Sequence, residues 1–189
     1  MKNNKWLKLI AIFIGASFLV GCGESSQYST TEASGSEVID NSVFDENSGA
    51  VVKDTTLDIN NTQTTISIQE GTSFIDEDSN LVTQPPVVNV KVEKNIVDTQ
   101  AELQIVSSEG EKVIPTEPIE VSVPVPDGVK PGDTVQVEVP DDSKLSSEEK
   151  LILIVVDKDG KVSIVVAPDI FQDRTVVLIV VEAPEASTN

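Results

Sequence analysis

The stretch IEVSVPVPDGVKPGDTVQVEV, residues 119–139, predicts two β-strands joined by a loop. Ile and Val alternate with Glu and Ser in its first part, and Val alternates with Gln and Glu in its last part. Because successive side chains of a strand point to opposite faces, this period of two places the apolar residues on one face. Proline has no amide hydrogen to donate, so Pro124 and Pro126 either end the first strand or place it at a sheet edge.

Similar strand patterns fill the chain from residue 51 to residue 184. Alternating stretches occur at 56–59, 64–68, 87–93 and 101–106, whereas 151–156, 161–167 and 175–182 are apolar on both faces. Apolar residues on both faces are typical of strands that are covered on both sides or paired at an interface. Turns rich in Gly, Pro and Asp separate the strands, among them a tight turn at Asp159-Gly160. We therefore predict an all-β fold, an antiparallel β-sandwich over residues 51–184, followed by a disordered tail at 185–189.

The N-terminus, MKNNKWLKLIAIFIGASFLVGC, has the order of parts found in an export signal. Lys2, Lys5 and Lys8 supply positive charge, and the apolar run 9–20 follows them. The run is too short to span a bilayer, so residues 1–21 are predicted to be a signal peptide that does not belong to the fold.

The end of this segment, Leu19-Val20-Gly21-Cys22, resembles the bacterial lipobox. The resemblance implies cleavage before Cys22 and acylation of that residue, which would anchor the protein to a membrane through its N-terminal lipid. The implied location is the cell envelope. In a Gram-negative source it would be the outer membrane, because Gly23 stands where inner-membrane lipoproteins carry Asp. In a Gram-positive source it would be the outer face of the cytoplasmic membrane. The alternative is an ordinary secretory signal with an incidental thiol.

Residues 22–50 are rich in Ser, Thr, Glu, Gly and Asn and contain few apolar side chains. Such a composition buries too little apolar surface to offset the entropy of ordering, so we expect a disordered acidic tether. As a flexible coil it would reach about 30 Å. The apolar patch at 38–44 could instead be a docking motif.

Charge excludes one class of partner. Removal of residues 1–21 takes away three of the 13 basic residues and none of the 32 acidic ones, which leaves a net charge of about −22. Such a surface repels nucleic acid and favours basic partners or divalent cations.

The residue types also exclude most catalytic sites. The chain has no His and a single Cys, Cys22, so Ser-His-Asp and Cys-His nucleophilic sites and His- or Cys-based zinc sites cannot form. Few aromatic residues remain after the signal peptide to line a sugar-binding cleft. We therefore expect no enzyme activity, with a carboxylate-dependent hydrolase as a distant alternative.

Calcium is the remaining inorganic ligand, because it takes oxygen donors alone. Asp76, Asp78 and Asn80 begin like an EF-hand loop, but Leu81 replaces the required Gly and Val87 replaces the closing Glu. A looser site could use Asp76 and Asp78 with Asp141 or Asp142 further along the chain. A calcium-stabilised adhesion module is accordingly the second functional hypothesis.

Three stretches resemble the ZU5-like β-sandwich domains of bacterial surface proteins. They are TISIQEGTSFIDEDSNLV (65–82), PIEVSVPVPDGVKPGDTVQVEV (118–139) and VVDKDGKVSIVVA (155–167). Near the final strand only Phe171 is kept of the His-Phe-Ser found in many of those domains, so other immunoglobulin-like sandwiches remain alternatives. The resemblance implies an interaction or spacer module without activity of its own.

The leading hypothesis is therefore a non-catalytic envelope lipoprotein that binds or spaces other surface components. We expect a protein partner to contact either exposed strand edges near residues 119–125 or the doubly apolar strands 151–156 and 175–182.

Overall fold

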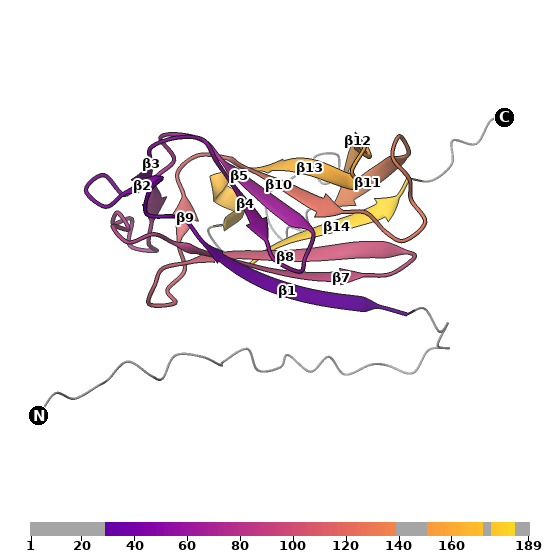
Figure 1. Cartoon of the computed structure of the whole chain (residues 1–189), viewed down its shortest axis with the longest axis horizontal. Helices are drawn as coiled ribbons and strands as arrows, with labels where there is room; N and C mark the ends of the chain where they lie inside the picture. The colour runs from indigo at the N-terminus through magenta and orange to yellow at the C-terminus, as the bar shows by residue number, and fades with distance from the viewer. Residues whose placement is uncertain (1–28, 139–150, 172–174, 184–189) are drawn as a thin grey trace, which may run out of the picture.

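The computed structural model describes residues 29–138, 151–171 and 175–183. Two large antiparallel sheets pack face to face, and the only helix in these ranges is the short 3₁₀ segment η1 (Pro168–Phe171). Figure 1 shows the two layers lying along the length of the molecule. The prediction of an all-β sandwich is confirmed.

The first sheet has six strands and the second has four. The order in the six-stranded sheet is β1 (Thr31–Val38), β7 (Val87–Lys94), β8 (Asp98–Val106), β14 (Val176–Glu182), β11 (Thr134–Glu138) and β12 (Leu151–Val155). The order in the four-stranded sheet is β13 (Lys161–Val166), β10 (Ile119–Pro124), β5 (Thr64–Ile68) and β4 (Thr55–Ile59).

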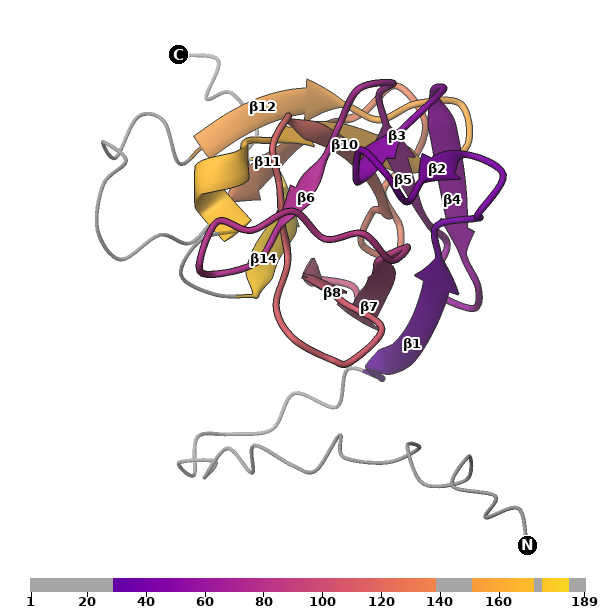
Figure 2. The same cartoon turned by 90° about the vertical axis from the view of Figure 1, so that its left-hand side faces the viewer.

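Two short strand pairs close one end of the sandwich (Figure 2). They are β2 (Phe44–Asp45) with β3 (Ala50–Val51), and β6 (Phe74–Ile75) with β9 (Ile114–Pro115). The rings of Phe44 and Phe74 are both buried, with centroids 6.4 Å apart. These aromatic side chains cover the core at this end.

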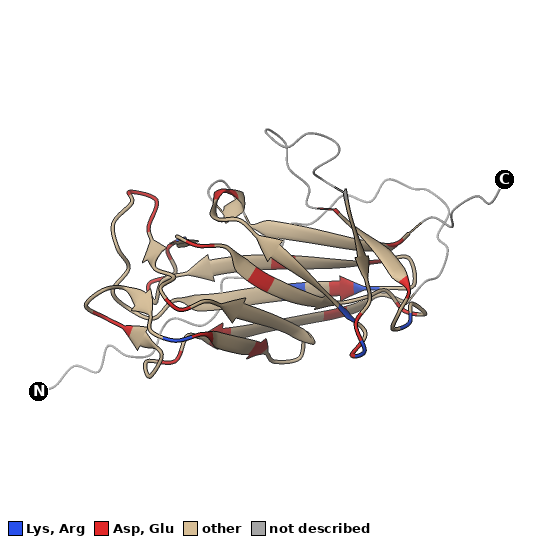
Figure 3. Cartoon of the chain, turned by 90° about the horizontal axis from the view of Figure 1, so that it is seen from above, with Lys and Arg blue, Asp and Glu red and all other residues tan. Residues whose placement is uncertain are grey.

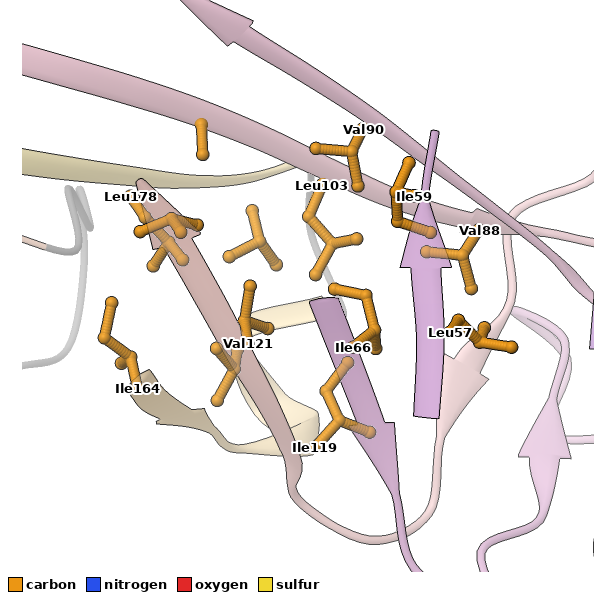
Figure 4. Close-up of a cluster of buried hydrophobic side chains, with 14 of the residues drawn as sticks. Leu57, Ile59, Ile66, Val88, Val90, Leu103, Ile119, Val121, Ile164 and Leu178 are labelled. Carbon is orange, nitrogen blue, oxygen red and sulfur yellow. The ribbon is translucent and has the colours of Figure 1, made fainter. Parts of the chain in front are cut away.

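The core follows directly from the period of two. On the six-stranded sheet, Val88, Val90 and Leu103 point inward, and on the four-stranded sheet Ile66 and Val121 meet them (Figure 4). Their outward neighbours are polar, and Ser122 and Ser163 share a hydrogen bond of 2.6 Å on the outer face. Burial of about 25 cal/mol for each Å² of apolar surface makes these inward-facing residues the main source of stability.

All of the predicted strands form, but two details differ. β10 ends at Pro124, as the prolines predict, yet it lies between β13 and β5 and is not an edge strand. The turn at 157–160 also forms, with Gly160 at φ 73°, but β12 and β13 belong to different sheets. The turn therefore crosses from one layer to the other instead of closing a paired hairpin.

The prediction of a disordered tether over 22–50 is wrong for the residues that the structure describes, and so is the boundary of the folded domain at residue 51. β1 pairs with β7 along its full length, from Thr31 opposite Lys94 to Val38 opposite Val87. Ile39, the next residue, is fully buried. A strand added to an existing sheet gains its backbone hydrogen bonds from the neighbour, so few apolar side chains suffice to order it. Ile39, Val43 and Phe44 of the apolar patch at 38–44 thus belong to the core, whereas Val38 is 52% exposed.

Candidate functional site

The edge strand β12 exposes apolar side chains to solvent. It pairs with β11 on one side and with no described strand on the other. Leu153 and Val155 are 67% and 61% exposed, and Ile152 is 41% exposed. Exposure of this extent on an unpaired strand leaves both apolar surface and backbone hydrogen-bonding groups available to a partner.

The outer face of the sheet carries apolar side chains on β12 and on β14, with the polar side chains of Gln136 and Glu138 of β11 between them. Leu153 lies opposite Gln136 of β11, which lies opposite Val181 of β14. One row away on the same face, Ile179 is also half-buried. We call Leu153, Val155, Val177, Ile179 and Val181 the outer apolar patch. The double apolar character of 151–156 and 175–182 thus has one cause, because one face of both strands packs in the core and the other lies in this patch.

Comparison of the four edge strands of the two large sheets shows that β12 is exceptional. β1 carries Glu32 and Glu37, β4 carries Asp58, and β13 carries Lys161. β12, with the sequence LILIV, carries no charge and no proline. Proteins usually protect edge strands with charged residues, because an unpaired apolar strand recruits other strands. The missing protection makes β12 the candidate binding edge.

The other edge that the sequence suggested is not available. Residues 119–124 form β10, where Ile119, Val121 and Val123 are buried and both neighbours are paired. A partner therefore cannot add to this strand, and the prediction of an exposed edge near residues 119–125 is wrong.

Asp76, one of the two predicted calcium ligands, makes hydrogen bonds within its own turn. The backbone N–H groups of Asp78 and Asn80 donate to its Oδ1 at 2.9 and 2.8 Å, and the Asn80 Nδ2 donates to its Oδ2 at 3.0 Å. The Asn80 side chain and these N–H groups hold the pKa of Asp76 below its ordinary value, because each stabilises the carboxylate. The alternating spacing of 76–80 is accounted for by an Asx turn.

No group of three or more acidic residues able to hold a metal ion occurs in the described ranges. Asp141 and Asp142, the further ligands that the sequence suggested, and Cys22, the predicted lipid attachment site, lie outside those ranges. No helix in the described part of the chain is long and apolar enough to cross a bilayer.

One charged cluster that the sequence did not suggest joins β1 to β7. The Lys91 ammonium contacts the Glu93 carboxylate at 2.6 Å and the Glu32 carboxylate at 3.1 Å. Hydrogen bonds to Glu93 and then to Glu32 raise the pKa of Lys91, so it stays cationic throughout the ordinary pH range. The cluster lies on the surface, where such ion pairs contribute little to stability. We interpret it as a contact between β1 and β7 and not as a binding site.

Comparison with known proteins identifies no relative: no protein-family model, curated protein or solved structure matches the chain. The resemblance to ZU5-like domains therefore stays a hypothesis based on strand order and turn residues. Functional inference has to come from the chain's own geometry.

Proposed function

We propose that the protein is a membrane-anchored lipoprotein of the cell envelope whose β-sandwich is a non-catalytic binding module. Its anchor would be Cys22, at the end of the lipobox-like segment. Its contact strand would be β12, to which an extended segment of a partner protein adds by strand pairing. The observation that carries the proposal is the uncharged, exposed edge of β12 in a chain whose other edges carry charge.

The surroundings of β12 favour a partner segment of defined chemistry. Leu153 and Val155 of β12 offer surface for alternate apolar side chains of the added strand. Glu138 of β11 lies between the two rows of the patch, Glu182 follows it at the end of β14, and the chain as a whole carries 32 acidic against 13 basic residues. Basic residues flanking the apolar positions would therefore strengthen and accelerate binding.

Two matched variants test the contact strand. Val155 and Val165 are both exposed valines, at 61% and 69%, but Val165 lies on β13 in the other sheet. We expect Val155→Lys to abolish cross-linking to the partner in intact cells, because the lysine places a desolvated charge in an apolar contact. Val165→Lys should retain the cross-linked product seen with the unchanged chain.

Formaldehyde cross-linking followed by mass spectrometry of the attached protein is the measurement. Both variants gain one lysine, with which formaldehyde reacts. A difference in cross-linked product between them is therefore due to the position of the lysine and not to its reaction with formaldehyde. Equal loss or equal retention in the two variants would exclude β12 as the contact strand. The absence of any reproducible product from the unchanged chain would favour a spacer role.

A further inference from the structure

The end of the sandwich where β1 begins differs in charge from the rest of the molecule. Four of the seven lysines in the described ranges lie in three segments there, 94–98, 125–133 and 157–161. Hydrogen bonds tie these segments together: the N–H of Asp127 donates to the Asn95 carbonyl at 3.0 Å, and that of Val125 donates to the Gly160 carbonyl at 3.3 Å. Figure 3 shows the loops with Lys at this end. We call it the lysine end.

The acidic residues of the three segments are engaged with their neighbours, whereas Glu182, opposite Val135 at the same end, is exposed. The three segments contain five acids and four lysines. Asp127 binds the Lys94 ammonium at 2.9 Å, and Asp157 accepts the N–H groups of Asp159 and Lys161 at 2.8 and 2.9 Å. At the opposite end, residues 39–54, 69–86 and 107–117 contain eleven acids and two lysines. An anionic surface therefore repels the opposite end far more than the lysine end.

The lysine end also carries an apolar tip. Ile96 and Val97 form the turn between β7 and β8 and are 50% and 56% exposed. Asn95 closes this turn, because its Oδ1 accepts the N–H of Val97 at 2.6 Å. Turn positions usually hold Gly, Asn, Asp or Ser. The conformation of this turn therefore does not account for the two branched apolar side chains at its tip.

Chain length places this tip near Cys22. Thr31, the first residue of β1, lies opposite Lys94, next to the turn that holds Ile96 and Val97. Nine Cα steps separate Cys22 from Thr31, and nine extended residues span at most roughly 32 Å. As a flexible coil the same segment reaches about 16 Å. A lipid on Cys22 would therefore hold the lysine end, and not the acidic end, at the membrane.

We propose that the lysine end lies on the anchoring membrane, with Ile96 and Val97 inserted among the lipid headgroups and Lys130 and Lys158 facing anionic lipid. The proposal rests on the proposed lipid anchor and adds a fixed orientation to it. A weak apolar insertion and a few lysines suffice, because the anchor already keeps the domain at the surface.

Depth-sensitive fluorescence on the full chain tests this orientation. Acylation would leave no thiol in the mature protein, so a single introduced cysteine takes the probe. We would compare Val97→Cys with Leu81→Cys, which is equally exposed at 54% but lies in the acidic turns of the opposite end. Each labelled protein would be extracted from cell membranes and reconstituted in phosphatidylglycerol and phosphatidylethanolamine vesicles with brominated acyl chains.

We expect bromine to quench the probe on Val97→Cys at least twice as strongly as the probe on Leu81→Cys. Equal quenching in protein that floats with the vesicles would overturn the orientation and leave the anchor intact. Protein that does not float, and whose Cys22 takes the probe, would overturn the proposed anchor and the orientation together.

Discussion

At the scale of single residues, most inward-facing side chains of the strands are apolar, and Thr99 is an exception. Its side chain points into the core from β8, opposite Val180, and its Oγ1 is buried without a hydrogen-bond partner. Thr64 is equally buried, but its Oγ1 donates to the Thr62 carbonyl at 3.4 Å. A buried donor without a partner costs free energy that a paired donor does not.

We therefore predict opposite effects for two substitutions of the same kind. Thr99→Val removes an unpaired hydroxyl at constant shape and should raise the free energy of unfolding by about 1 kcal/mol. Thr64→Val removes the hydrogen bond to the Thr62 carbonyl from a buried position, so it should lower that free energy by a similar amount. Urea titration of both proteins measures the difference. A loss of stability in Thr99→Val would show that its hydroxyl is not an unpaired group.

Asp76 shows that one residue spacing fits two different local structures. Alternate oxygen-bearing side chains at 76–80 are needed both by a calcium loop and by a turn in which a carboxylate accepts backbone N–H groups. The structure shows the turn, in which the Asp76 oxygens accept bonds from Asp78 and Asn80, and calcium binding stays a prediction.

At the scale of elements, the alternating strands could be predicted and β1 could not. In β10 and β11 the valines recur at every second position, because one face of each strand is buried. β1 has the sequence TEASGSEV and no buried side chain in its eight residues. Its order comes from hydrogen bonds to β7, whose paired residues lie 49 to 63 positions further along the chain, and no local sequence pattern indicates such a pairing.

Gly35 is the one residue of β1 that has a packing requirement. A Cβ at this position would lie 2.2 Å from the Asn60 carbonyl oxygen and 2.9 Å from Cγ2 of Ile59. β1 therefore approaches the end of β4 closely, and its glycine closes the side of the sandwich between the two sheets. In the sequence this glycine looks like part of a flexible Ser- and Gly-rich tether.

Gly35→Ala should displace β1 from the sandwich. We expect the free energy of unfolding to fall by about 1–3 kcal/mol, because backbone atoms must shift to admit the methyl group. Ser34→Ala is the matched control, since Ser34 is exposed on the outer face of the same strand. Thermal unfolding of both variants measures the effect. An unchanged melting temperature in Gly35→Ala would contradict the close approach of β1 to β4.

The candidate binding edge β12 could likewise be predicted only in part from the sequence. The apolar character of both faces is visible at 151–156 and 175–182, and it correctly marks both strands as unusual. Their places in the sheet are not visible: β14 is a central strand and β12 an edge strand. Only the exposed position of β12 turns the apolar pattern into a candidate contact surface.

At the scale of the whole molecule, the order of β1 changes the relation of the domain to its anchor. A tether over residues 22–50 would hold the sandwich about 30 Å from the lipid as a free coil. The structure leaves only residues 23–30 between Cys22 and the start of β1. If Cys22 carries the proposed lipid, the domain is a short-tethered module with its lysine end toward the membrane and its acidic end away from it.

The central claim is the lipid anchor, because the orientation and the role in the envelope both depend on it. Intact-mass spectrometry of the protein extracted from cell membranes tests the claim most directly. We predict a mature chain that begins at Cys22 and carries the additional mass of its acyl chains. A chain that retains Met1, or that is cleaved elsewhere with Cys22 unmodified, would contradict the account.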